Sequence, residues 1–180
     1  MGAPSPISTV SIEEYLCNPA YEHFEYIDGD VVELNAGNKP HSKIKSKCAR
    51  KIEEYLDKRP GSYAAVELRC RVSVAGRTRF YLPDVAIVLA DDASESRFLE
   101  RAPDLFVEIR SPDDPIASLT RKMNDYFVNG AKVAWLVLPE ERSALIFTPN
   151  APPRTVLAGE TLDGGDLLPD LQIALDELFA

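Results

Sequence analysis

Residues 82–90 read LPDVAIVLA, and residues 105–110 read LFVEIR. Both runs are dense in branched apolar residues, which is typical of strands that are covered on both faces of a sheet. Each run nevertheless contains one carboxylate, Asp84 in the first and Glu108 in the second. The two runs therefore predict central strands, and each strand carries a charge whose position in a buried element needs an explanation.

Two amphipathic helices are predicted, one before and one after these strands. Residues 41–57 carry a helical apolar stripe opposite a Lys/Glu face, and Pro60 with Gly61 ends this helix. Residues 118–129 carry a second stripe, and Gly130 follows where a C-terminal cap belongs. The positions of the two stripes are Ile44, Cys48, Ile52, Tyr55 and Leu56, and then Leu119, Met123, Tyr126 and Phe127.

Further strands are predicted on the N-terminal side. Residues 24–34, FEYIDGDVVEL, form two alternating runs around an Asp-Gly pair, a strong hairpin signal that places Glu25 and Glu33 on neighbouring strands. Residues 65–74, AVELRCRVSV, alternate apolar and polar side chains. This alternation predicts one strand with a solvated face, ended by a turn at Gly76.

The C-terminal part predicts more strands. Residues 133–138, VAWLVL, directly follow the second helix, and residues 144–148, ALIFT, pair with them as a hairpin. The Pro- and Gly-rich stretch to Pro169 indicates short edge strands and loops before a last helical turn near Asp176.

A chain of 180 residues that is 45% hydrophobic has room for one core. We expect a flexible N-terminal arm over residues 1–10 and a single domain over residues 11–180. Within that domain, Ser11 and Glu14 have the spacing of a capping box for a short helix that ends at about Cys17.

Composition limits the classes of protein that are possible. No run is long and apolar enough for a membrane span, and the N-terminus lacks a secretory pattern, so we expect a cytoplasmic protein. Cys17, Cys48 and Cys70 form no Cys-x-x-Cys pair and indicate reduced, mostly buried thiols. The formal charge of -9 argues against a protein that coats nucleic acid, although metal-dependent nucleases concentrate carboxylates and recruit cations.

The two strand carboxylates have two competing explanations. Desolvating an isolated carboxylate costs several kcal/mol, so each needs a cation or an opening to solvent. One explanation is a strand-end ion pair with an arginine, for which Arg110 is available. The other is Mg²⁺, which takes one or two carboxylates and keeps its other positions for water and phosphate oxygens. Lys122, at the edge of the second apolar stripe, is either a third member of that site or a lysine whose ammonium reaches water.

The ordered set of features resembles the putative restriction endonuclease family of bacteria within the PD-(D/E)XK nuclease superfamily. The resemblance covers most of the chain and rests on the FEYIDGDVVEL hairpin, His41, Pro83-Asp84, Glu108 within FVEIRSP, and Lys122 and Tyr126 before NGAKVAWLVLP. It implies an α/β (α+β) restriction-endonuclease-like fold, a mixed sheet flanked by helices with an N-terminal hairpin and C-terminal edge strands. It also implies that Asp84 and Glu108 bind Mg²⁺, with Mn²⁺ as a substitute.

One position departs from the superfamily signature, which places a lysine two residues after the acidic residue. Here that residue is Arg110, which stays protonated and can bind a phosphate but cannot act as a base. In the family resembled, a helix lysine is thought to replace the strand lysine, and this maps to Lys122. Glu25 and His41 belong to the same pattern as accessory groups. Their ordinary alternatives are a cross-strand ion pair for Glu25 and a helix-start role for His41.

The sequence thus supports three hypotheses for function. The first is a Mg²⁺-dependent nuclease that cleaves DNA, with Asp84, Glu108 and Lys122 as catalytic residues and Arg110 as a phosphate clamp. Such an enzyme is expected to be a homodimer, since cutting a duplex needs two sites. The second is a catalytically silent protein of the same fold that binds nucleic acid or a protein. The third is a hydrolase of small phosphoesters, which would show a closed pocket.

Overall fold

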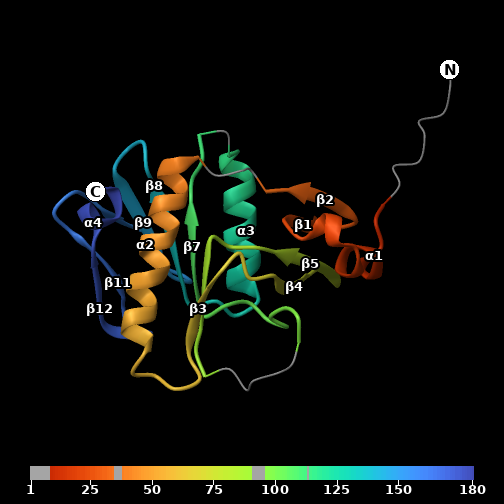
Figure 1. Cartoon of the computed structure of the whole chain (residues 1–180), viewed down its shortest axis with the longest axis horizontal. Coiled ribbons are helices and arrows are strands. Elements are labelled where there is room, and N and C mark those ends of the chain that lie inside the picture. The colour runs from red at the N-terminus through yellow and green to blue at the C-terminus, as the bar shows by residue number, and fades with distance from the viewer. Residues whose placement is uncertain (1–8, 35–37, 91–95, 113) are drawn as a thin grey trace.

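The structure, a computed structural model, describes residues 9–34, 38–90, 96–112 and 114–180 (Figure 1). The predicted arm over residues 1–10 falls mainly on residues 1–8, which lie outside the described residues. The largest sheet contains β3 (Tyr63–Val66), β6 (Val85–Val88), β7 (Leu105–Ile109), β8 (Val133–Leu138), β9 (Ser143–Phe147) and β10 (Arg154–Val156). Its order is β10-β9-β8-β7-β6-β3, with β7 and β8 parallel and the other neighbours antiparallel. The predicted mixed sheet is therefore confirmed.

A second sheet carries the predicted N-terminal hairpin. Its strands are β1 (Phe24–Ile27), β2 (Asp30–Glu33), β4 (Cys70–Val74) and β5 (Arg77–Tyr81), in the order β2-β1-β5-β4. Asp28 and Gly29 form the hairpin turn with φ values of 56° and 105°, as a two-residue turn between twisted strands requires. Before this sheet lie α1 (Ile12–Cys17), where the Glu14 N–H donates to Ser11 Oγ as predicted, and a short 3₁₀ helix (Pro19–Tyr21).

The prediction of a single strand over residues 65–74 is wrong. The chain leaves the large sheet after Val66 and enters the second sheet at Cys70. Between them, Glu67 adopts a positive φ of 50°, and its N–H donates to the Pro83 carbonyl at 3.1 Å. Alternation of side chains does not reveal such a break, because the residues on each side keep the strand period. The crossing matters for the site because it presents Glu67 between the two sheets.

Two helices cover opposite faces of the large sheet, and Figure 1 shows β7 between α2 (Lys39–Leu56) and α3 (Ile116–Val128). Successive strand residues alternate between the two faces, so Val107 packs in the cluster with α2, whereas Phe106 packs in the cluster with α3. The α2 helix begins two residues earlier than predicted, because Asn38 Oδ1 accepts the backbone N–H of His41. The α3 helix ends as predicted, with Gly130 at a φ of 102°.

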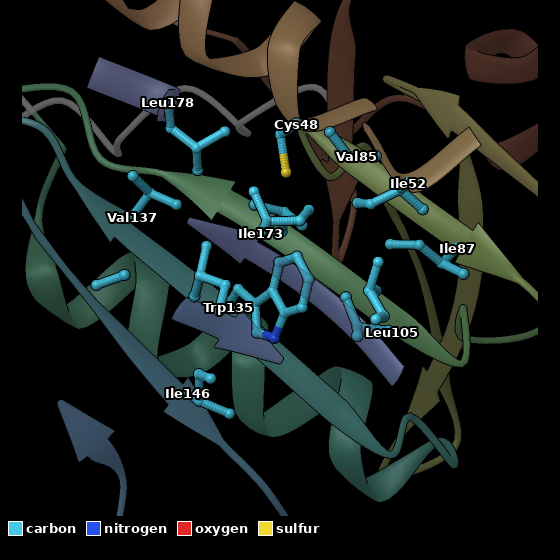
Figure 2. Close-up of a cluster of buried hydrophobic side chains, with 14 of the residues drawn as sticks. Cys48, Ile52, Val85, Ile87, Leu105, Trp135, Val137, Ile146, Ile173 and Leu178 are labelled. Atoms are coloured by element: carbon cyan, nitrogen blue, oxygen red, sulfur yellow. The ribbon is translucent and has the colours of Figure 1, made fainter. Parts of the chain in front are cut away.

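The larger hydrophobic core lies on the α2 side of the sheet and has Trp135 near its centre (Figure 2). Its α2 members are Ile44, Cys48, Ile52 and Leu56, all on the predicted apolar stripe. Of the predicted C-terminal edge strands, β10 lies at the edge of the large sheet. β11 (Thr161–Gly164) and β12 (Leu168–Ala174) instead form a separate two-stranded sheet, which closes over this core together with α4 (Leu175–Phe179). Trp135 Nε1 donates to the Asp163 carbonyl at 3.1 Å and so ties β8 to β11. No helix in the described part of the chain is long and apolar enough to cross a membrane.

A substitution of Ile52 would measure how much this core contributes to the stability of α2, which carries part of the site described below. Ile52 is fully buried, so Ile52→Ala should lower the free energy of unfolding by about 2–5 kcal/mol through lost contacts and a residual cavity. Urea denaturation followed by the fluorescence of Trp135, the single tryptophan, measures this loss. Glu54→Ala, an exposed change on the same helix, should stay within about 0.5 kcal/mol. Equal stabilities of the two variants would contradict the packing described.

Candidate active site

Asp84 and Glu108 lie opposite each other at one end of the β6–β7 ladder. Val85 pairs with Val107 in the antiparallel register, so the next pair along places Asp84 opposite Glu108. Both carboxylates were predicted to lie within strands. Glu108 does lie inside β7, but Asp84 immediately precedes β6. The backbone N–H of Ile109 donates to Asp84 Oδ2 at 2.8 Å and fixes that carboxylate against β7.

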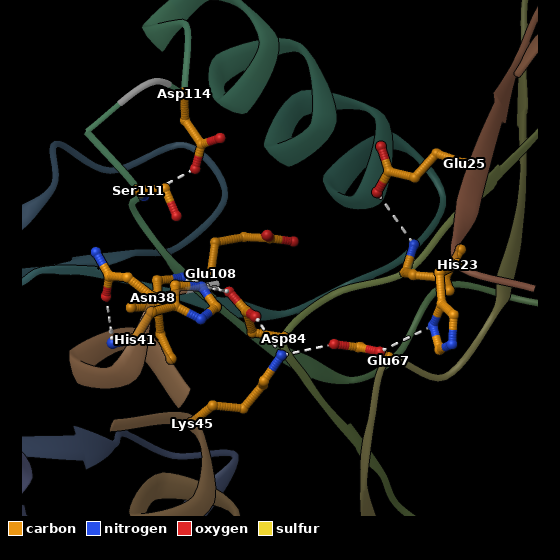
Figure 3. A network of polar contacts seen from close by, with 12 residues as sticks. His23, Glu25, Asn38, His41, Lys45, Glu67, Asp84, Glu108, Ser111 and Asp114 are labelled. Carbon is orange, nitrogen blue, oxygen red and sulfur yellow. Dashed lines mark hydrogen bonds and ion pairs between the residues drawn. The ribbon is translucent and has the colours of Figure 1, made fainter. Parts of the chain in front are cut away.

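Two side chains from α2 also contact the carboxylate of Asp84 (Figure 3). His41 Nε2 lies 3.2 Å from Oδ2, and Lys45 Nζ lies 3.3 Å from Oδ1. Lys45 also contacts Glu67 Oε1 at 2.6 Å. Burial alone would raise the pKa of Asp84, but His41, the N–H from β7 and Lys45 together outweigh burial and lower it. Asp84 is therefore held as a carboxylate.

Lys122 is buried and reaches the same region from α3. Its side chain is 9% exposed, so the interpretation as a lysine whose ammonium reaches water is wrong. Three oxygens lie within 3.0 Å of Nζ: Glu25 Oε1 at 2.7 Å, Glu108 Oε1 at 2.9 Å and the Leu82 carbonyl at 3.0 Å. Burial disfavours the ammonium, but Glu108 and Glu25 outweigh burial and raise the pKa of Lys122. The lysine thus stays charged and joins β1, β7 and α3.

Glu108 differs from Asp84 in its electrostatic environment. Burial raises the pKa of Glu108 to about 8, more than the nearby Lys122 lowers it. Although Lys122 Nζ lies 2.9 Å from Glu108 Oε1, the contact is not aligned as a hydrogen bond, and this oxygen has no hydrogen-bond partner among the described residues. A buried carboxylate oxygen without a donor calls for an explanation. Two neighbouring carboxyls with pKa values moved in opposite directions are typical of a functional site.

The inner part of the site has an excess of negative charge. Four carboxylates, those of Glu25, Glu67, Asp84 and Glu108, share the two ammonium groups of Lys45 and Lys122. With Glu108 ionised, and leaving His23 and His41 aside, two negative charges are not compensated within this set. An added divalent cation would balance these two charges.

The donor set suits a hard cation with few protein ligands. Over the described ranges, no group of three or more His, Cys, Asp or Glu side chains could hold a metal ion. Mg²⁺ does not require such a group, because it binds through one or two carboxylates and retains several waters. Asp84, directly before β6, and Glu108, within β7, provide two carboxylates at the same end of the β6–β7 ladder, so the residues present fit Mg²⁺ bound in this way.

These groups lie in a cleft of about 400 Å³ between the hairpin, α2 and the start of α3. The inner side chains lining it are Glu25, His41, Lys45, Glu67, Asp84, Glu108 and Lys122. Its mouth has apolar side chains from both sides together with one exposed cation, and these are Val32, Leu34, Pro115, Leu119 and Arg121. The sequence-predicted residues thus converge on one cleft, with a single exception.

The exception is Arg110, which was predicted to clamp a phosphate. Its Nη1 donates to Glu141 Oε1 at 3.3 Å, and Arg110 does not line the cleft. The alternative explanation, an ion pair between Arg110 and Glu108, is also wrong, because Glu108 pairs with Lys122. Ser111 behaves as a residue that ends β7, since its N–H donates to Asp114 Oδ2 at 2.8 Å.

Sequence reasoning missed a buried network beside Lys122. Asp125, one turn further along α3, accepts hydrogen bonds at 2.6 Å from both Arg79 and Tyr81. Arg79 also donates two hydrogen bonds to Asp28 in the hairpin turn. This network fixes α3 against the second sheet. The guanidinium of Arg79 is thus committed to the two carboxylates of Asp28 and Asp125.

The chain was compared with protein families, with curated proteins and with solved structures. The model of the Uma2 family, described as "Putative restriction endonuclease", matches residues 12–176. No curated protein matches the chain. Among solved structures, "a putative nuclease belonging to DUF820" from Anabaena variabilis is similar with a TM-score of 0.81 and 22% identity, over 94% of this chain and 97% of that chain. At this identity, the structural likeness shows a shared fold.

The contacts of Lys122 predict a large effect of its removal. Lys122→Met should lower the free energy of unfolding by about 3–5 kcal/mol at pH 8, because it leaves two buried carboxylates without their cation. Adding Glu108→Gln should restore part of this loss, since one buried charge fewer is left. Chemical denaturation followed by circular dichroism measures both variants. Lys132→Met, an exposed change after α3, is the control, and a Lys122→Met protein as stable as this control would disprove the ion-pair cluster.

Proposed function

The chain belongs to the Uma2 family of putative restriction endonucleases, and from that premise we propose that it is a Mg²⁺-dependent nuclease that hydrolyses phosphodiester bonds of DNA. The main support within the chain is the uncompensated negative charge around Asp84 and Glu108. Family membership suggests the substrate class, and the charge suggests the cation. Neither alone would favour a cation-dependent nuclease over another protein of the same fold.

The residues of the cleft would have different roles in this reaction. Asp84 and Glu108 would hold the cation, while the N–H of Ile109 and the ring of His41 keep the Asp84 carboxylate in place. A bound Mg²⁺ would supply Lewis-acid chemistry, stabilising negative charge on the scissile phosphate and lowering the pKa of a water molecule. Lys122 keeps Glu108 and Glu25 close together.

Two parts of the proposal concern the substrate and the assembly. Cleavage of both strands of a duplex needs two sites, which a homodimer would provide. Nicked circles alone would indicate that single sites act independently, and linear product formed without free nicked intermediate would indicate coupled sites. A cleft of about 400 Å³ would also admit a small phosphoester, so hydrolysis of such a compound without cleavage of DNA would replace the nuclease proposal.

Cation binding is the first test. Isothermal titration with Mn²⁺ at pH 7.5 should show binding to the parent protein, and Asp84→Asn and Glu108→Gln should each weaken it by about tenfold or more, or about 1.4 kcal/mol. Glu33→Gln is a matched control, because Glu33 lines the same cleft but is exposed at its mouth. Its affinity should match that of the parent. A parent protein that binds no cation, or an equal loss in all three variants, would refute the proposed site.

Catalysis is tested separately. With Mg²⁺, the parent should convert supercoiled plasmid to nicked or linear DNA, and Asp84→Asn and Glu108→Gln should lower the rate by at least about a hundredfold, or 2.7 kcal/mol. Gel electrophoresis of the plasmid forms measures the rate, with Glu33→Gln again as the control. A protein that binds Mn²⁺ through both carboxylates but cleaves neither DNA nor RNA would instead be a catalytically silent member of the family.

A further inference from the structure

We propose that Lys45, and not Lys122, is the ammonium group that binds the substrate phosphate in the cleft. This inference rests on the proposed nuclease function and assigns a substrate-binding residue to it. Both lysines lie within about 3.3 Å of a carboxylate that would hold the cation, so their distance from the cation site does not distinguish them. What distinguishes them is how many oxygens surround each ammonium group and how far each side chain is exposed.

Lys122 is enclosed by protein oxygens. An ammonium group has three N–H donors, and three oxygens already lie within 3.0 Å of Lys122 Nζ. Two of these oxygens belong to Glu25 and Glu108, which are buried. Turning Lys122 toward a phosphate would take its charge away from two buried carboxyl groups, and leaving a buried charge without its counter-ion is strongly destabilising.

Lys45 meets the requirements of a phosphate ligand. Two carboxylates occupy two of its donors, Glu67 at 2.6 Å and Asp84 at 3.3 Å, and no third acceptor contacts it in the described part of the chain. Its side chain is 17% exposed, against 9% for Lys122, and it lines the cleft. The shorter contact, with Glu67, anchors the ammonium, while the longer contact is with the carboxylate that would bind the cation. Lys45 therefore has one donor free, and a second when Asp84 serves the cation.

The other cations near the site are less suited to this role. Arg110 does not line the cleft and pairs with Glu141. Arg121 lines the cleft but is exposed at its mouth. Lys43, two residues before Lys45 on α2, is exposed and lines a separate pocket beside the C-terminus. Lys43 is thus a matched control, with the same charge on the same helix outside the cleft.

The test measures DNA binding without relying on turnover. A fluorescein-labelled 20-base-pair duplex is titrated with protein in Ca²⁺, and anisotropy gives the affinity at several salt concentrations. Lys45→Met should weaken binding by about tenfold and reduce the slope of log K against log salt by about 0.9, the value for one lost phosphate contact. Lys45→Arg should bind within about threefold of the parent, since it keeps the charge. Lys43→Met should change neither quantity.

A second readout concerns the cation. Lys45 and a cation on Asp84 repel each other, so Lys45→Met should raise the affinity for Mn²⁺ in calorimetry, whereas Lys43→Met should leave it unchanged. If the methionine variant unfolds, the DNA titration and the Mn²⁺ calorimetry are repeated with Lys45→Gln, which retains an N–H for Glu67. A residue with a merely structural role would not alter the salt slope.

The outcomes separate this inference from the proposed function. A parent protein that binds Mn²⁺ and DNA, together with Lys45 variants that match Lys43→Met in affinity and salt slope, would overturn the role of Lys45 and leave the nuclease proposal intact. A parent that binds no Mn²⁺ would remove the proposed function and this inference together. Loss of DNA affinity and salt slope in Lys45→Met or Lys45→Gln, with both retained in Lys45→Arg, would establish the phosphate contact.

Discussion

The burial of Lys122 between Glu25 and Glu108 is the constraint on which the site depends. Each of these three side chains comes from a different element: β1 in the second sheet, β7 in the large sheet, and α3. Taking one such charge out of water costs several kcal/mol, so none of them is stable in the interior without the others. The two sheets and the helix must therefore meet in one arrangement, which fixes the carboxylate of Glu108 beside the cleft. The network of Asp125, Arg79 and Tyr81 holds α3 in the same arrangement from its other side.

A second ion-pair group joins the remaining parts of the cleft in the same way. Lys45 on α2 contacts Asp84 before β6 and Glu67 at the crossing between the sheets. The hydrophobic core under α2 therefore does more than stabilise the fold, because it sets the distance from Lys45 to Asp84. The two groups differ in one respect. In the first group, three oxygens enclose the ammonium of Lys122, whereas in the second group Lys45 contacts two carboxylates and lines the cleft.

Local patterns predicted the parts of this structure that local interactions determine. The Asp-Gly hairpin, the amphipathic stripes and the two apolar strands with their carboxylates all follow from residues close together in the sequence. The strand predicted over residues 65–74 was wrong because the break at Glu67 depends on a contact with Pro83, which no local pattern contains. Lys45 was not singled out among the basic residues of its helix, for a related reason. It lies one helical turn after His41, a spacing visible in the sequence, but it had been placed on the solvated Lys/Glu face. The spacing indicates a shared contact only once the direction of α2 is known, because that direction brings both His41 and Lys45 to Asp84.

The acidity of the chain bears on how such a site could receive DNA. With a formal charge of -9, the protein as a whole repels a polyanion, and its cleft carries uncompensated negative charge of its own. Phosphate binding must then come from charges within the cleft, where low dielectric strengthens each of them. A divalent cation on Asp84 and Glu108 would cancel the local excess, and the ammonium of Lys45 would then face the phosphate without a competing carboxylate at Asp84. Cation binding and DNA binding are on this account one coupled event, because the same Asp84 oxygens that attract the cation hold Lys45 in its absence.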